Sequence, residues 1–593
     1  MPELNRFSAL DWSVVAGVLA LTTLVGSLLG KHTTLRDFYL GGRKLPWWIV
    51  SFSIVATEIS AVTMVAVPWV VFRPGGDFTA LQLLAIGSIL ARFVIAWKLV
   101  PIYFAREVYS PYDILGEKLG EGARRMASAL FVAGNLLGQA ARVYLVALVL
   151  EVVLNQDLAA LSERTGVPSL ALAVGIVVSF AALWTSIGGV AAVAWTDFIL
   201  VLVVLASVTA MLVVIANGLD LGFERVWRVG VDSHRFRFFD FDTSPARAYT
   251  FWAAALASSF GNIGAYGVDQ KVAQRLLCCR DAHDARKAII ASSLAMVITL
   301  LVSIVGVALV AWYEQHAMSE AGAALIASAD DRIVPVFVLE AMPEGLRGLV
   351  IAGILAAALT TMTAALSSLS QTTLSALWMP VARKLRAQRG IVIEALAEER
   401  AALRASRILI VAFAVILGFL AVSLQPVAER YGSVLDLALS LPGYTQGALL
   451  AGILLAVTRA PIDGSGYVWS APLSAFWVFC CAWHGPRTEF LLPPIAFACL
   501  AAWLFLRAWP DLRAGASFGR VAFQSFVLGI TLALCGWVGY HGEFWWQPIA
   551  SDAGRWSSLA FPWYVPAGCL FAFVLGHLLA RTTPRLEPTL SRT

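Results

Sequence analysis

The chain has 593 residues, of which 59% are hydrophobic and only 14% are charged. Soluble domains have about 45–50% apolar and about 25% charged residues, so this composition and the mean hydropathy of +0.77 indicate an integral membrane protein. The net charge of +5 is too small for a nucleic-acid-binding protein, which excludes nucleic acid as a partner.

The apolar residues form fifteen runs that we interpret as membrane-spanning helices, each of which needs about 20 residues. The predicted spans are 8–30, 47–72, 79–105, 125–154, 169–187, 190–216, 249–268, 288–313, 349–379, 406–424, 433–457, 468–484, 490–508, 522–540 and 562–580. Lys and Arg are about twice as frequent in the loops on one side of these spans. The positive-inside rule therefore predicts an outside N-terminus and a cytoplasmic C-terminus.

The second span, 47–72, has a polar centre. It contains Ser51, Ser53, Thr57, Glu58, Ser60 and Thr63. A carboxylate near mid-membrane costs at least about 2.5 kcal/mol unless it is paired, protonated or solvated. Glu58 is thus a candidate for a functional site or for a buried ion pair, and the hydroxyl side chains would satisfy backbone groups if this helix unwinds.

The seventh span, 249–268, carries Gly261, Gly264 and Gly267 at a spacing of three, with Asn262 between them. Each glycine lowers helix stability by about 1 kcal/mol relative to alanine. The cluster predicts either a break in this helix or a face where a neighbouring helix approaches closely.

Hydroxyl side chains form a stripe on the ninth span, 349–379. Thr360, Thr363, Ser367 and Ser370 follow one another at helical spacing, and Thr361 flanks them. Hydroxyl oxygens are hard neutral donors that can replace the hydration shell of Na⁺. Hydrogen bonding between helices is the alternative explanation.

Two further charged residues lie inside predicted spans, where burying a charge is energetically unfavourable. Arg142 lies inside the fourth span and either pairs with Glu58 or binds an anionic group of a substrate. Asp197 opens the sixth span and is a candidate cation ligand, proton relay or helix cap. The sequence alone leaves these alternatives open.

Spans two to six and seven to eleven form two groups of five, and each group opens with a polar or glycine-interrupted helix. Because five is odd, the second group enters the membrane in the opposite direction, which is the inverted-repeat architecture of many secondary transporters. The predicted organisation is an extra helix and first cytoplasmic loop (1–45), a first repeat (46–216), an extracellular loop (217–247), a second repeat (248–457) and peripheral C-terminal helices (458–593).

Several stretches together resemble successive motifs of the sodium:solute symporter family. They read ATEISAVTMVAVP, SPYDILGEKLG followed by RRMASALF, SIGGVAAVAWTDFI, YGVDQKVAQRLL and GLRGLVIAGILAAALTTMTAALSSLSQTT, and the late SLAFPWYVPAGCLFAFVLGHLLA. The resemblance covers about 37 to 457 and returns near 562–580. It implies an all-α integral membrane protein of the leucine-transporter type, a 5+5 inverted repeat with extra helices at both ends, working by alternating access.

The resemblance also implies site residues. The family's sodium site corresponds here to the carbonyls of Ala56, Ile59 and Ala357 and the hydroxyls of Thr360 and Thr361, where the family more often has serine. The family's aspartate near a second cation site or ion path corresponds to Asp197. The positions of substrate contacts are Glu58, Thr63, Arg142, Asn262 and Tyr266.

The sugar-carrier residues of the family are not reproduced as a set, and Glu58 with Arg142 favours an anionic or zwitterionic solute. The expected function is sodium-coupled symport of a small organic solute across a bacterial plasma membrane, without catalysis, organic cofactor or any metal but sodium. A single subunit suffices for such transport. Proton coupling through Glu58 or Asp197 is the alternative, and a transporter-like membrane sensor is the rival from another class.

Overall fold

The computed structural model of the chain describes residues 7–29, 35–105, 108, 110–187, 189–328, 332–390, 394–426, 434–458, 462–482, 492–541 and 559–581. These residues fold almost entirely into helices, and none of them belongs to a β-strand. An isolated bridge joins Leu45 to Cys279. The fold is therefore all-α, as predicted.

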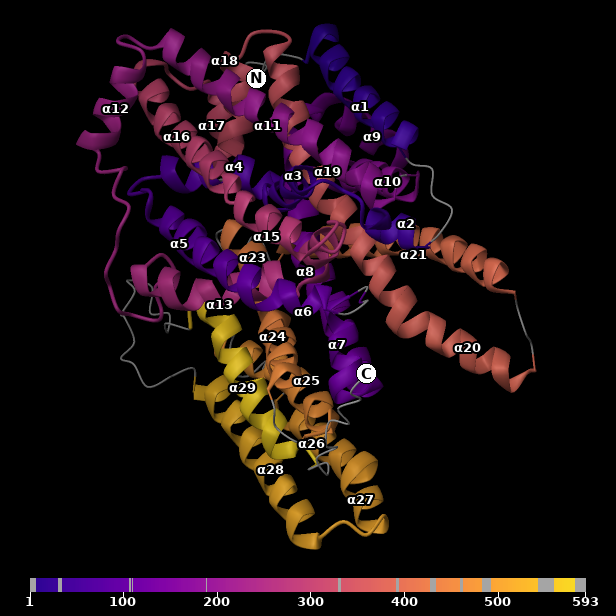
Figure 1. The fold of residues 1–593 in the computed structure, drawn as a ribbon. Coiled ribbons are helices and arrows are strands. Elements are labelled where there is room, and N and C mark those ends of the chain that lie inside the picture. The colour runs from indigo at the N-terminus through magenta and orange to yellow at the C-terminus, as the bar shows by residue number, and fades with distance from the viewer. Residues whose placement is uncertain are drawn as a thin grey trace. The chain divides into compact units, whose positions relative to one another are not determined.

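The chain forms two compact units, and Figure 1 labels their helices. The first unit comprises Met1–Ser110, Val132–Asp242 and Tyr249–Pro442. Its helices are α1 (Ala9–Leu29), α2 (Leu35–Leu40), η1 (Gly41–Arg43), α3 (Trp47–Glu58), α4 (Ala61–Phe72), α5 (Thr79–Val94), η2 (Ile95–Leu99), α6 (Val100–Phe104), α8 (Glu121–Val153) from Val132 onward, α9 (Asn155–Thr165), α10 (Ser169–Ile187), α11 (Val190–Gly218), α12 (Phe223–Asp232), η3 (Ala253–Ser258), α13 (Ser259–Asn262), η4 (Ile263–Val268), α14 (Gln270–Leu276), α15 (Ala282–Ala291), α16 (Leu294–Gln315), α17 (Glu320–Ser328), α18 (Ile333–Ala341), α19 (Leu346–Thr372), η6 (Thr373–Trp378), α20 (Met379–Gln388), α21 (Ala395–Ser423) and α23 (Val434–Ser440).

The second unit comprises Pro111–Phe131, Thr243–Ala248 and Gly443–Thr593. Its helices are α7 (Pro111–Leu119), the start of α8, α24 (Gly443–Val457), α25 (Ser465–Ala482), α26 (Leu492–Trp503), η8 (Leu504–Ala508), α27 (Trp509–Arg513), α28 (Phe518–His541), η9 (Phe561–Trp563) and α29 (Tyr564–Leu579). Helices α24, α25 and α29 pack side by side in this unit. Small residues permit the close approach: a Cβ on Gly447 of α24 would lie 2.7 Å from the backbone of α29.

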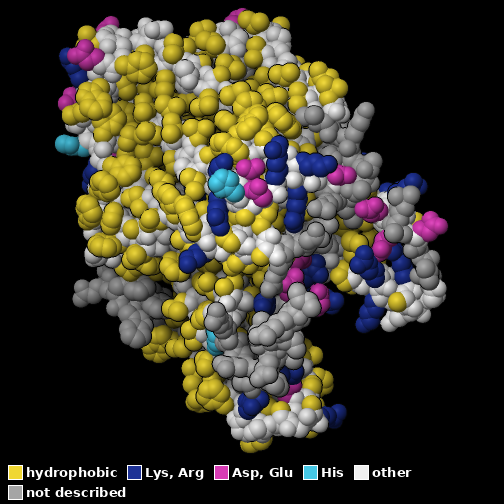
Figure 2. All heavy atoms as spheres, in the orientation of Figure 1, with side chains coloured by type: hydrophobic (Ala, Val, Ile, Leu, Met, Phe, Trp, Pro, Cys, Tyr) yellow, Lys and Arg dark blue, Asp and Glu magenta, His cyan; other side chains and the backbone are white. Residues whose placement is uncertain are grey.

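Eleven described helices are long and apolar enough to cross a membrane, and α3 with α4 forms a bent twelfth. These twelve coincide with twelve of the fifteen predicted spans. Helices also cover most of the described residues of the runs 249–268, 468–484 and 490–508, but these runs do not meet the same requirement of length and hydropathy. Figure 2 shows broad continuous hydrophobic areas on one face of the molecule, with the charged side chains gathered into separate groups.

The second predicted span is broken at its polar centre. Helices α3 and α4 meet at an angle of 55°, because Ile59 (φ −75°, ψ 106°) and Ser60 (φ −114°, ψ 174°) leave helical geometry. Ser60 then starts α4 as the N-cap of a capping box with Thr63. The hydroxyl side chains thus satisfy backbone groups that the break sets free, as the sequence indicated.

The glycine cluster does not itself mark the second break. Residues 253–268 remain helical, largely with the wide turns of a π-helix, and the chain leaves helical geometry at Asp269 (φ −66°, ψ 128°). Gly267 instead allows close packing, since a Cβ there would lie 2.5 Å from Cδ1 of Leu99. The alternative of a break within 249–268 is therefore wrong, and the close-packing alternative applies to Gly267. The chain is interrupted only after this span, where the Asp269 side chain caps α14 by accepting from the backbone N–H of Lys271.

Helix α19 lies at the centre of the first unit and packs along α11. A Cβ on Gly353 of α19 would lie 2.2 Å from Oγ of Ser207 on α11, and this hydroxyl donates to the carbonyl of Leu349 at 2.8 Å. This tight packing fixes the position of α19 along the axis of α11. It thereby positions the α19 hydroxyl groups beside the broken helix.

The predicted extracellular loop, 217–247, contains the end of α11 and then α12, and it continues as turns and irregular chain. Within the first unit, the guanidinium of Arg235 donates to the carbonyls of Val71, Arg73 and Gly76 at the end of α4. The described part of this loop is thus attached to the broken helix.

Candidate functional site

The predicted sodium ligands come together where α19 crosses the break between α3 and α4. Oγ1 of Thr360 lies 2.9 Å from the carbonyl oxygen of Ala56 and 3.1 Å from that of Ala357. Oγ1 of Thr361 lies 2.9 Å from the carbonyl oxygen of Ala358 and 3.3 Å from that of Ala357. The Ile59 residue borders the same small cavity as Ala56, Ala357 and Thr360.

This cluster offers neutral, hard oxygen donors in a buried position, since both threonines are at most 2% exposed. Such donors suit an alkali cation better than a transition metal. Among the described residues, no group of three or more His, Cys, Asp or Glu side chains is arranged to hold a metal ion. The donor set thus fits Na⁺.

The rest of the α19 hydroxyl stripe has a different role. The Ser370 hydroxyl lies 3.0 Å from the Tyr39 hydroxyl and 3.1 Å from that of Ser406 on α21, and Gln274 donates to Ser367 at 3.4 Å. These bonds join α19 to other helices. Interhelical hydrogen bonding thus explains the end of the stripe at Ser367 and Ser370. Only the end near Thr360 reaches the broken helix, and an ion site there stays a prediction.

Glu58 is the last residue of α3, and its carboxylate pairs with Arg92 of α5. Nη2 of Arg92 lies 2.5 Å and 2.6 Å from the two carboxylate oxygens, and both side chains are almost fully buried. Arg92 also donates to the hydroxyl of Ser292 at 3.0 Å and to that of Ser88. The Tyr266 ring lies 4.7 Å from the guanidinium. The predicted pairing of Glu58 with Arg142 is therefore wrong, because Glu58 pairs with Arg92.

Asp197 forms a second buried ion pair. Arg275 of α14 lies 3.2 Å from its carboxylate, and Ser53 of α3 bridges the two, donating to Asp197 at 2.5 Å and accepting from Arg275 at 2.7 Å. Asp197 lies well inside α11, which begins at Val190 with Gly189 as its N-cap. The helix-cap alternative for Asp197 is therefore wrong.

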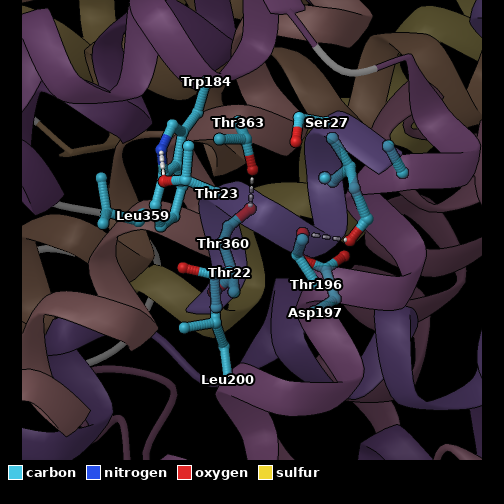
Figure 3. A pocket seen from close by; sticks show the side chains of 13 residues that line it. Thr22, Thr23, Ser27, Trp184, Thr196, Asp197, Leu200, Leu359, Thr360 and Thr363 are labelled. Carbon is cyan, nitrogen blue, oxygen red and sulfur yellow. Dashed lines mark hydrogen bonds between the residues drawn. The ribbon is translucent and has the colours of Figure 1, made fainter. Parts of the chain in front are cut away.

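Asp197 also borders a hydroxyl-lined pocket between α1, α10, α11 and α19, drawn in Figure 3. Its lining residues are Thr22, Thr23, Gly26, Ser27, Trp184, Ala192, Val193, Thr196, Asp197, Leu200, Leu359, Thr360 and Thr363. The pocket therefore connects Asp197 with Thr360 of the candidate sodium site. A second cation site or ion path at Asp197 stays a prediction.

Arg142 of α8 differs from these paired charges. No hydrogen bond or ion pair joins its guanidinium to another described residue, and its Nε atom is buried without a partner. The groups near enough to act on its charge are Asp269 and Tyr266, and Asp269 is already paired with Lys271 at 3.5 Å. Arg142 therefore presents a cation whose hydrogen-bonding capacity is unused.

The other predicted substrate contacts are arranged as follows. Asn262 donates to the backbone and hydroxyl oxygens of Ser258 at 2.8 and 2.9 Å, which holds its side chain along its own helix. Tyr266 follows one turn later and lies near both Arg92 and Arg142. Thr63 serves in the capping box of α4. Tyr266 is thus the predicted contact that links the ion pair with the free guanidinium.

The sequence interpretation missed Arg92 and Arg275 as partners. Arg92 was visible as a charge inside an apolar run, and Arg275 follows the glycine cluster within YGVDQKVAQRLL. The available signal was that a buried carboxylate needs a buried cation. Which cation it meets depends on how distant helices pack.

The chain is similar to known sodium-coupled transporters. The family model described as "Sodium:solute symporter family" matches residues 38–472. The sodium-coupled monocarboxylate transporter 2 of Mus musculus is 24% identical over 100% of this chain and 87% of its own length. The sodium-coupled monocarboxylate transporter 1 of Homo sapiens is 26% identical over 77% of this chain and 70% of its own. A solved Na⁺-coupled sialic acid symporter in a substrate-bound outward-open state shares the fold, with a TM-score of 0.68 and 19% identity over 98% of this chain and 100% of its own.

Proposed function

The chain belongs to the sodium:solute symporter family, and we propose that it imports a small organic monoanion, such as a monocarboxylate, together with sodium. Sodium-coupled symport is the activity common to the family and to the sodium-coupled relatives. The proposal assigns the sodium to Ala56, Ile59, Ala357, Thr360 and Thr361, and the solute to the region of Arg142 and Tyr266. It includes alternating access between the repeats 46–216 and 248–457, in a bacterial plasma membrane with the N-terminus outside.

The observation that carries the proposed solute class is that Arg142 has no ionic partner among the described residues, whereas three neighbouring buried carboxylates each have one. Glu58 is paired with Arg92, Asp197 with Arg275, and Asp269 with Lys271. Each of these pairs is neutral as a whole. Arg142 adds one positive charge that no described side chain balances by an ion pair. A solute with one negative charge would complete the set.

A carboxylate is the chemical group that best fits this position. The guanidinium of arginine is planar, always charged, and binds carboxylates through two parallel hydrogen bonds. Hydrogen bonds to a charged group contribute about 1.5–3 kcal/mol each, more than those between neutral groups. Two of the relatives are monocarboxylate transporters, which supports the same solute class for this chain.

Uptake by purified protein in proteoliposomes tests this proposal. We expect an inward sodium gradient to drive uptake of propionate, butyrate or lactate, and much less uptake of the uncharged propionamide or of the dianion succinate. Replacing the sodium gradient by a proton gradient of equal size should not drive uptake. Uptake that follows the proton gradient instead would replace sodium coupling by proton coupling.

The variant Arg142→Gln isolates the role of the guanidinium. We expect it to raise the half-saturating concentration of monocarboxylate at least tenfold, about 1.4 kcal/mol of binding free energy, while the half-saturating sodium concentration changes little. A matched control is Arg507→Gln, since Arg507 is also buried but donates to the carbonyl of Leu579 in the second unit. Unchanged affinity in Arg142→Gln would remove Arg142 from the solute site.

A further inference from the structure

Two amide side chains share one face of α8 with Arg142. Asn135, Gln139 and Arg142 follow one another at spacings of four and three residues, which places them on the same side of the helix. Along the helix axis, Gln139 lies about 4.5 Å and Asn135 about 10.5 Å from the level of Arg142. We call this side of α8, defined by these three residues, the polar face.

Buried hydrogen-bonding groups on the polar face lack partners. Asn135 is 5% exposed, and both its amide nitrogen and its amide oxygen have no hydrogen bond among the described residues. Gln139 is 1% exposed, and its amide oxygen is likewise without a partner. The Nε atom of Arg142 is also buried without a hydrogen-bond partner among the described residues. Most buried polar groups in proteins are paired, so three such residues in a row on one face need an explanation.

The polar face lies close to a segment of this chain that contacts the broken helix. Gly138 flanks the polar face, and a Cβ there would lie 2.7 Å from Cγ of Pro442. Pro442 follows α23, which packs against α4. The polar face thus lies beside a segment that is itself attached to the broken helix, where movement during transport would change its surroundings.

We propose that the polar face is the track along which a solute anion leaves Arg142, with the amides of Gln139 and Asn135 as its successive hydrogen-bonding partners. The inference rests on the proposed function. In the predicted orientation α8 runs from the cytoplasm outward, so the track leads from Arg142 toward the cytoplasm. Amide groups suit this role because they hydrogen-bond an anion without the strong attraction of a second cation, which would retain it.

Apolar variants of similar shape test the track. We expect Asn135→Leu with Gln139→Met to lower the turnover of propionate uptake at least tenfold, while the half-saturating concentrations of external propionate and sodium change less than threefold. The thermal stability of this variant should be equal or higher, because buried polar groups without partners are removed. The amide-preserving exchange Asn135→Gln with Gln139→Asn should retain most of the turnover.

A matched control is Gln524→Met in the second unit, where the Gln524 amide donates to the carbonyl of Ala580 at 3.2 Å. This variant should lose stability without a change in turnover per folded molecule. Unchanged turnover in the double variant would overturn the proposal, and so would a turnover loss that follows a loss of stability. The proposal would also be overturned if the double variant raised the half-saturating concentration of propionate as much as Arg142→Gln does, because the amides would then belong to the binding site.

A second measurement does not depend on the identity of the solute. Asn135→Cys and Gln139→Cys should react with the anionic thiol reagent 2-sulfonatoethyl methanethiosulfonate from the cytoplasmic side, faster in potassium than in sodium. Ala140→Cys, on another side of α8 and fully buried, should not react. Equal labelling of all three positions, or of none, would overturn the track. Failure of propionate uptake with positive labelling would count against the monocarboxylate proposal alone.

Discussion

Loss of either partner of the Glu58–Arg92 pair is expected to destabilise the protein by about 3–5 kcal/mol, because removal of one partner leaves the other charge buried and uncompensated. The pair lies at the end of α3, with side-chain exposures of 8% for Glu58 and 1% for Arg92. The Arg92 guanidinium also holds Ser88 and Ser292. Its loss would therefore remove the hydrogen bonds that join α5 to α3 and to the end of α15.

Removing both charges should cost much less than the sum of the single changes. We expect Glu58→Gln and Arg92→Met each to lower the thermal unfolding temperature strongly, and the double variant to recover most of that loss. The coupling should amount to several kcal/mol, whereas Glu58→Gln combined with Arg142→Gln should be additive within about 0.5 kcal/mol. Thermal unfolding of the unsubstituted protein and of the five purified variants (three single and two double) measures both cycles. Coupling of Glu58 to Arg142 but not to Arg92 would contradict the structure.

Loss of both hydroxyls of the candidate sodium site is expected to raise the half-saturating sodium concentration of uptake tenfold or more. The variant Thr360→Ala with Thr361→Ala removes two of the five proposed ligand oxygens and leaves the three carbonyls. A tenfold change corresponds to about 1.4 kcal/mol of sodium binding free energy. The variant should also lose the bond of about 1 kcal/mol between Thr360 and the broken helix.

Sodium titrations of uptake and of thermal stability check this result independently, since a bound ion stabilises the folded protein by an amount that grows with the logarithm of its concentration relative to its dissociation constant. The pair of changes Thr360→Ser and Thr361→Ser keeps both oxygens and should keep sodium affinity near its original value. Thr372→Ala is the matched control, because Thr372 is a buried hydroxyl on the same helix, about 17 Å along the axis from Thr361. Sodium dependence that is unchanged in the double alanine variant would exclude these hydroxyls as ligands.

The sequence predicted the elements of this site better than their partners. It identified the polar centre of span 47–72 and the hydroxyls of Thr360 and Thr361, because an unusual residue inside an apolar run is visible locally. The break between α3 and α4 follows from the same residues, since Ser60 and Thr63 cap the new helix. For 249–268 the composition predicted either a break or close packing and could not decide between them. Glycine serves for packing as well as for bending, and only the neighbouring Leu99 shows which use applies to Gly267.

The sequence alone determined that this is a membrane protein and where most of its spans lie. It also identified three charged residues within spans, where burial is energetically unfavourable, namely Glu58, Arg142 and Asp197. These properties depend on composition and on spacing within single helices. The tertiary structure decided which cation meets which carboxylate, because Arg92, Arg142 and Arg275 are equivalent as residue types and differ only in where their helices pack. The resulting ion pairs balance the charges of Glu58 and Asp197, and Arg142 has no ionic partner among the described residues. The composition thus shows that charges are few, whereas the packing of distant helices decides that Arg142 has no ionic partner among the described residues.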